Sequence, residues 1–186
     1  MEDNRRNSQD TMVSERTMLT GSFTDPISTE NAYRALQDRG YTKDEINVIM
    51  SEDTRKKHFS HDANIKKVEI GTKAAEGAGK GSAIGATIGA IAGIVAAVGT
   101  SLVIPGLGLV IAGPLAAGIA GAGAGGVTGG IIGALVGAGM PEERARLYES
   151  GVKKGHVVLG VHPRNDADAE YIERYWRTNK GENIYR

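Results

Sequence analysis

The stretch GSAIGATIGAIAGIVAAVGTSLVIPGLGLVIAGPLAAGIAGAGAGGVTGGIIGALVGAGMP, residues 81–141, decides the fold that the sequence predicts. It runs for roughly 60 residues without an Asp, Glu, Lys or Arg. A helix crosses a bilayer with about 20 apolar residues, so the stretch is long enough for two crossings. It therefore predicts a helical hairpin made of two membrane-type helices.

Glycines recur at every fourth position in both halves of this stretch. The two series are Gly77, Gly81, Gly85, Gly89 and Gly93 before the middle, and Gly121, Gly125, Gly129, Gly133 and Gly137 after it. Glycines spaced in this way line one helix face and let another helix backbone approach closely, as membrane helices do. We predict two glycine zippers with these ten glycines as the helix-packing interface, and with the large side chains facing lipid or other subunits.

The middle of the stretch predicts the turn of the hairpin. Pro105, Gly106 and Gly108 are turn-forming residues, and Pro114 suits the first turn of the second helix. The turn is flanked by apolar residues, whereas a loop in water is usually polar. Either the tip lies at the far membrane interface, or it stays inside the bilayer as a re-entrant hairpin covered by protein.

A soluble hairpin buried in the core of an oligomer is the main alternative to membrane insertion. Each glycine costs about 1 kcal/mol relative to alanine in an exposed helix. Ten such positions cost on the order of 10 kcal/mol, which is comparable to the net stability of a domain. In hydrocarbon, a helix is the only inexpensive way to satisfy the amide groups, so the energetics favour the bilayer. Low-complexity disorder is a third alternative.

The overall composition limits the partners and the location. The chain has 22 basic and 22 acidic residues, so its charge favours neither a nucleic acid nor an acidic partner. With no cysteine, disulfide and thiolate chemistry are excluded. The first ten residues have no apolar core, so we expect no amino-terminal secretory signal. Basic residues flank the uncharged stretch on both sides, and the positive-inside rule places both termini in the cytoplasm.

The charged flanks predict one α+β domain built from both ends of the chain. We expect a disordered tail over residues 1–16, a β-α-β first half over 17–51, and a polar linker that becomes helical over 52–80. The zipper hairpin occupies residues 81–140, and residues 141–186 supply the second half. Because two crossings return the chain to the same side, the halves can pair in a ferredoxin-like sheet.

No residue pattern indicates a catalytic, cofactor-binding or metal site. His58 and His61 share a helix face in a lysine-rich linker but have no clear third ligand. His156 and His162 bracket a predicted strand without carboxylates at a defined spacing. The segment Gly79–Ser82 lacks the glycine spacing and the preceding strand of a phosphate-binding loop. We therefore expect no enzyme, no cofactor and no identifiable small-molecule ligand.

Three pieces of the chain together carry a resemblance to a known family. They are the segment from TGSFTD to ALQDRGY, the hairpin with IPGLG and AGP, and the return GMPEERARLYESGVKKGHVVLGV. In this combination the chain resembles bacterial general stress proteins of the heat-induced YflT-domain type, from about Thr17 to the end. The resemblance implies a stress-inducible bacterial protein and carries over no catalytic residue. The long zipper insertion departs from the shorter members.

The sequence as a whole predicts a non-enzymatic, stress-associated protein of the bacterial inner membrane. It is expected to form homo-oligomers through its glycine-zipper helices, to carry a cytoplasmic α+β domain, and to affect membrane integrity or permeability. The alternative is a cytoplasmic, soluble oligomeric scaffold or binding protein whose hairpins are buried in a helical core. The expected partners are the lipid bilayer and other copies of the chain.

Overall fold

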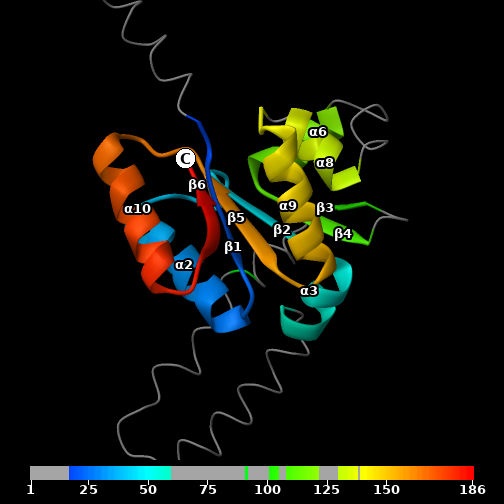
Figure 1. The fold of residues 1–186 in the computed structure, drawn as a ribbon, viewed down its shortest axis with the longest axis horizontal. Coiled ribbons are helices and arrows are strands. Elements are labelled where there is room, and N and C mark those ends of the chain that lie inside the picture. The colour runs from blue at the N-terminus through cyan, green and yellow to red at the C-terminus, as the bar shows by residue number, and fades with distance from the viewer. Residues whose placement is uncertain (1–16, 60–90, 92–100, 105–107, 122–129, 138) are drawn as a thin grey trace, which may run out of the picture.

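The computed structural model describes residues 17–59, 91, 101–104, 108–121, 130–137 and 139–186. These residues form a six-stranded sheet with helices on both of its faces (Figure 1). The strand order is β3-β4-β2-β5-β1-β6, and every pair of neighbours is antiparallel. The predicted α+β class is thus confirmed.

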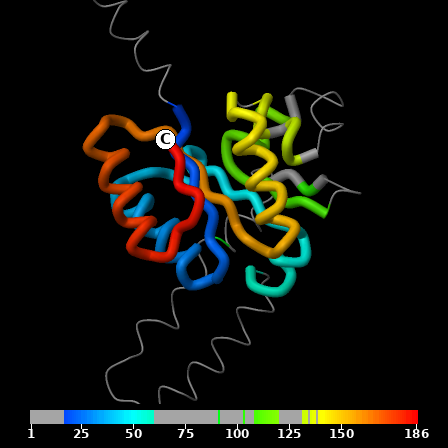
Figure 2. Tube along the Cα trace, viewed as in Figure 1, coloured from blue at the N-terminus to red at the C-terminus, as the bar shows by residue number. Residues whose placement is uncertain are grey.

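Two β-α-β units from opposite ends of the chain supply four of the strands. The first unit consists of β1 (Leu19–Phe23), α2 (Pro26–Asp38) and β2 (Ile46–Ser51), and the second of β5 (Val157–Val161), α10 (Asp166–Thr178) and β6 (Glu182–Tyr185). Strand β5 lies between β1 and β2, and β6 lies on the other side of β1. The two units are therefore interleaved in one sheet (Figure 2).

Local capping signals set the starts of the two crossover helices. The Asp25 side chain accepts a hydrogen bond from the Ser28 N–H at 2.8 Å, and Pro26 occupies the first position of α2. The Asn165 side chain accepts from the Asp168 N–H at 2.8 Å at the start of α10. Both caps satisfy amide groups that have no partner within the first helical turn.

The middle of the uncharged stretch forms strands, where a turn between two helices was expected. Strands β3 (Ser101–Ile104) and β4 (Leu109–Ala112) pair with each other, and β4 also pairs with β2. The predicted helical hairpin over residues 81–140 is therefore wrong at its centre. The reason is that the runs LVI and LVIA are rich in β-branched residues and flank turn-forming residues, a pattern that favours a β-hairpin.

One face of the sheet is covered by α2 and α10 (Figure 1). The buried residues of this first cluster include Trp176, whose ring meets that of Phe23 edge to face at 5.6 Å between centroids. Ile91, from the first half of the uncharged stretch, is fully buried in the same cluster. The first half therefore reaches the protein core at this residue.

The opposite face is covered by α6 (Pro114–Gly121), α8 (Gly130–Gly137) and α9 (Glu142–Lys153), with the short α3 (Glu52–His58) at the end of β2 (Figure 1). Leu115, Ile119, Ile131 and Leu135 of α6 and α8 are buried in this second cluster. These large side chains thus pack on the protein's own sheet, although the sequence predicted that they would face lipid or other subunits. Among the residues that the structure describes, no helix combines the length and apolar character needed to cross a bilayer.

A sharp turn at Gly113 directs the chain from β4 into α6. Gly113 has a φ of +92°, and a Cβ atom at this position would lie 2.1 Å from the carbonyl oxygen of Ile46. Only glycine combines this backbone conformation with so close an approach to β2.

We predict that Gly113→Ala destabilises the protein by more than about 3 kcal/mol, because the new Cβ overlaps the β2 backbone and the conformation is strained. Chemical denaturation followed by circular dichroism measures this change. Gly118→Ala is the matched control: no atom lies within 4 Å of its Cβ position, so replacing this helical glycine should stabilise the protein by up to about 1 kcal/mol. Equal effects of the two substitutions would contradict the structure.

Candidate functional site

A row of small and polar residues crosses the sheet on the face that α6, α8 and α9 cover. Cross-strand pairing places Asn47 of β2 beside Gly160 of β5, and Gly160 beside Thr20 of β1. Asn47 and Thr20 are only 2% and 1% exposed. The Met18 sulfur lies 3.1 Å from where a Cβ of Gly160 would be, so Met18 fills the space above this glycine. We name this row with Met18 the polar row.

Asn47 joins the polar row to the start of α6. Its Oδ1 accepts a hydrogen bond from the Leu115 N–H at 2.8 Å, and its Nδ2 donates to the Met18 sulfur at 3.5 Å. Leu115 is the second residue of α6, where the N–H has no partner within the helix. A side chain from a distant strand therefore caps this helix and fixes its position on the sheet.

Tyr148 of α9 closes the other end of the polar row. Its hydroxyl donates to the Asn183 carbonyl at 2.7 Å and lies 2.8 Å from Oγ1 of Thr20. Burial raises the pKa of Tyr148 far above its usual range, so the phenol stays neutral. The Arg144 guanidinium stacks over the Tyr185 ring at 4.4 Å from its centroid. These contacts tie α9 to both β1 and β6.

Gly118 of α6 and Gly133 and Gly137 of α8 are exposed or partly exposed, on the side of these helices away from the buried residues. In α8, Ile131 and Leu135 are buried, whereas Val136 and Gly137 are exposed and Gly133 is partly exposed. Among the described residues, no atom lies within 4 Å of the Cβ position of Gly137. The described part of the chain therefore leaves this end of the predicted zipper face on α8 uncovered.

The structure locates only some of the predicted interface residues. Gly121 ends α6, Gly133 and Gly137 lie in α8, Pro114 is the first residue of α6, and Gly108 precedes β4 with a φ of +61°. The other predicted positions lie outside the described residues: Gly77, Gly81, Gly85, Gly89, Gly93, Gly125, Gly129, Pro105 and Gly106. The predicted tail over residues 1–16 and residues 60–80 of the linker lie outside them as well.

The histidines considered as ligands lie at the ends of different elements or outside the described residues. His58 ends α3, while His156 precedes β5 and His162 follows it. His61 lies outside the described residues. Within the part of the chain that the structure describes, no three His, Cys, Asp or Glu side chains are grouped so that they could hold a metal ion.

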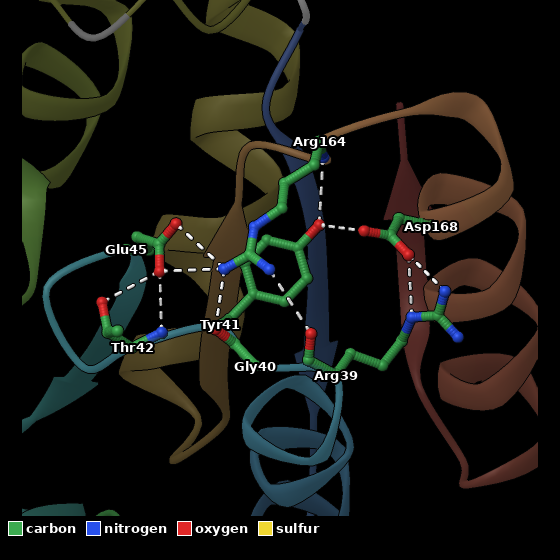
Figure 3. A network of polar contacts seen from close by, with 7 residues as sticks. All are labelled: Arg39, Gly40, Tyr41, Thr42, Glu45, Arg164 and Asp168. Atoms are coloured by element: carbon green, nitrogen blue, oxygen red, sulfur yellow. Dashed lines mark hydrogen bonds and ion pairs between the residues drawn. The ribbon is translucent and has the colours of Figure 1, made fainter.

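Figure 3 shows a second polar feature, a network that joins the two β-α-β units. The Arg39 Nε donates to Asp168 Oδ1 at 2.8 Å, and the Tyr41 hydroxyl donates to Asp168 Oδ2 at 3.0 Å. The Tyr41 oxygen accepts from the Arg164 N–H at 3.0 Å, and the Arg164 guanidinium lies 4.3 Å from the Tyr41 ring centroid. Arg164 also pairs with Glu45 at 3.2 Å.

This network holds the Asp168 carboxylate in its charged form. Burial alone would raise the pKa of Asp168, but the hydrogen bonds from Arg39 and Tyr41 and the charges of Arg39 and Arg164 outweigh it, so the pKa lies below its usual value. Both carboxylate oxygens are occupied by donors of the protein. The network therefore acts as a clamp between the end of α2 and the start of α10.

Sequence reasoning missed both polar features because their members are far apart in the chain. Asn47 and Leu115 are separated by 68 positions, and Arg39 and Asp168 by 129. The one local signal was Asn47, a polar residue within the otherwise apolar strand INVIM. A polar residue in a strand buried on both faces needs a hydrogen-bond partner.

The chain matches no family model, no curated protein and no solved structure.

We predict that Asn47→Ala lowers the free energy of unfolding by about 1–3 kcal/mol, because it leaves the buried Leu115 N–H without an acceptor. Amide hydrogen exchange should speed up first at Leu115 and through α6. Gln37→Ala is the control, since it removes an exposed amide from α2 and should change stability by no more than about 0.5 kcal/mol. Unchanged exchange in α6 of the Asn47 variant would argue against the cap.

We also predict that the contribution of the clamp to folding stability is lost at acid pH. The folded pKa of Asp168 is below the value of about 3.9 for an unfolded chain. The stabilisation is therefore complete above roughly pH 5 and is lost as the pH falls through the folded pKa.

The Asp168→Asn variant tests this dependence. It should be less stable by about 1–3 kcal/mol at pH 7 and should lose less stability than the wild type between about pH 5 and pH 2. Urea denaturation at a series of pH values measures both. Asp53→Asn, at an exposed position on α3, should leave the pH profile unchanged.

Proposed function

We propose that the protein is a non-enzymatic, stress-associated scaffold that forms homo-oligomers through its glycine-rich segments. The α+β domain holds part of the uncharged stretch on its own sheet, and the exposed glycine face of α8 packs against a helix of another copy. The stress association follows only from the resemblance to bacterial general stress proteins.

The observation that carries this proposal is the orientation of α8. Its large residues Ile131 and Leu135 are buried on the sheet, while Gly137 lies outward with open space at its Cβ position. Exposed glycine in a helix costs about 1 kcal/mol relative to alanine. Gly137 belongs to the series of glycines at every fourth position and lies next to Val136, which is 42% exposed. Such a surface is more typical of helix packing than of contact with water.

We further propose that the domain is ferredoxin-like. The four strands of the two β-α-β units have the order β6-β1-β5-β2, all antiparallel, with α2 and α10 on one face. This arrangement supports the interleaving of two halves that the sequence suggested. The β3–β4 hairpin then extends the sheet next to β2.

A membrane protein is the second candidate, and the absence of charge on α8 favours it. The helix has the sequence GIIGALVG, so the residues it exposes, Val136 and Gly137 among them, carry no charge. In this version the exposed glycines pack helices within the bacterial inner membrane, and the assembly affects membrane integrity or permeability.

Gly137→Leu tests the packing of α8 between copies. Because the Cβ position is open, the domain should remain folded, while a leucine on the glycine face should block the close approach of a second helix and reduce the cross-linked assembly by at least about tenfold. Gly118→Leu is the matched control: it is also an exposed helical glycine with open space, but it lies outside the period-four series. Full-size assemblies of the Gly137 variant would refute the scaffold proposal.

Fractionation of bacterial cells distinguishes the two candidates. Membranes are washed with alkaline carbonate, and the wild-type chain is followed by immunoblotting. Release as a defined large particle supports the scaffold, whereas retention until detergent is added supports the membrane protein. A monomer in the released fraction would contradict both.

A further inference from the structure

Two methionines hold the ends of the docked α6–α8 segment and line one small cavity. Met18 lies in the second cluster beneath the start of α6, where its sulfur accepts from Asn47. Met140 follows α8 in the turn to α9, and its N–H donates to the Leu135 carbonyl at 3.0 Å. Both side chains line a cavity of about 20 Å³ together with Thr17, Gly139, Pro141 and Arg144.

The cavity gives the Met18 and Met140 side chains a solvent contact that Met50 lacks. A volume of about 20 Å³ exceeds the roughly 10–15 Å³ that one water molecule needs. Met18 and Met140 are 7% and 6% exposed, whereas Met50, in the first cluster on the opposite face, is 0% exposed. A small oxidant therefore has a route to Met18 and Met140 before the protein unfolds.

We propose that Met18 and Met140 form a modification site for small hydroperoxides, at which oxidation loosens α6 and α8 from the sheet. The thioether sulfur attacks the terminal oxygen of the hydroperoxide, the O–O bond breaks, and a sulfur–oxygen bond forms. Sulfur loses two electrons, and the peroxide is reduced to water, or to an alcohol if it is an organic hydroperoxide. With no cysteine in the chain, methionine is its most readily oxidised sulfur.

The packing around Met18 explains why this change matters. Its sulfur lies 3.5 Å from Asn47 Nδ2 and against Gly160, so a sulfoxide formed there changes the contact that this sulfur makes with Asn47. The sulfoxide is also polar and would lie in an apolar cluster. Since Asn47 contacts Met18 and also caps α6, a shift at Met18 that moves Asn47 also changes its hydrogen bond to the Leu115 N–H.

The same geometry makes Met140 oxidation act on α8. Met140 is buried in the second cluster and is hydrogen-bonded to Leu135, which is itself fully buried. A polar sulfoxide at this position opposes the burial of the α8–α9 turn. Oxidation of both methionines therefore weakens the docked segment at its two ends. This inference rests on the docking of α6 and α8 alone and does not require the proposed assembly.

The test treats the full-length wild-type protein with hydrogen peroxide and follows each methionine by peptide mass mapping. We expect Met18 and Met140 to be oxidised at least about tenfold faster than Met50. Oxidised protein should show faster amide exchange in α6 and α8, and a midpoint of thermal unfolding lowered by roughly 3–8 °C. Treatment with both methionine sulfoxide reductases should restore the original values.

The variant with Met18→Leu and Met140→Leu provides the control, because leucine keeps an apolar side chain that peroxide does not oxidise. Its exchange and thermal midpoint should not respond to peroxide. Equal oxidation rates for Met18, Met50 and Met140 in the wild type would overturn the proposal, as would oxidation of Met18 and Met140 that leaves exchange in α6 and α8 unchanged. These rates come from the wild type and do not depend on whether the variant folds. The cross-linked assembly of the Gly137 variant reports separately on the proposed function.

Discussion

The buried hydrogen bond from the Leu115 N–H to Asn47 ties together the parts of this structure that are far apart in the sequence. It joins the first β-α-β unit to the uncharged stretch, and it forms only if Gly113 brings the chain against the Ile46 carbonyl. Asn47 in turn lies in register with Gly160 of the second unit. An unpaired amide here would cost about 1–3 kcal/mol. One polar contact thus specifies how three segments meet on a face that is otherwise held by non-directional apolar packing.

The two-sided burial of the sheet changes the energetic account of the glycine-rich stretch. Each fully buried Leu or Ile contributes about 1.5–3 kcal/mol, and Leu115, Ile119, Ile131 and Leu135 all gain this on the sheet. Such a gain offsets the cost of several helical glycines at about 1 kcal/mol each. Ile91, from the first half of the stretch, is also buried within the protein. A stretch of this composition can therefore be accommodated either in lipid or on the protein's own sheet.

The sequence was sufficient for the elements whose signals are local. The Asp25–Pro26 start of α2 and the apolar strand at Val157–Val161 follow from a helix cap and from the run of apolar residues. The predicted pairing of both chain ends in one sheet is confirmed, although the argument from two membrane crossings is not what produces it. The β3–β4 hairpin could not be predicted in this way, because an apolar run such as LVI fits either a helix or a strand. The pairing of the hairpin with β2 is what makes this segment a strand. The polar row and the clamp were missed for a related reason: Asn47–Leu115 and Arg39–Asp168 are contacts that no spacing within one element can show.

The preference of α6 for the sheet depends more on its polar contacts than on its apolar area. Leucine and isoleucine side chains leave water equally in a protein core and in hydrocarbon, so their burial does not distinguish the two environments. The Asn47 cap does, because moving α6 into lipid would break its hydrogen bond and leave the Leu115 N–H without an acceptor in hydrocarbon. Tyr148 adds to this preference, since its hydroxyl is bonded to Thr20 and Asn183 in the layer that α9 forms beside α8. The small polar groups on this face therefore favour the docking of α6 on the sheet over its transfer to hydrocarbon.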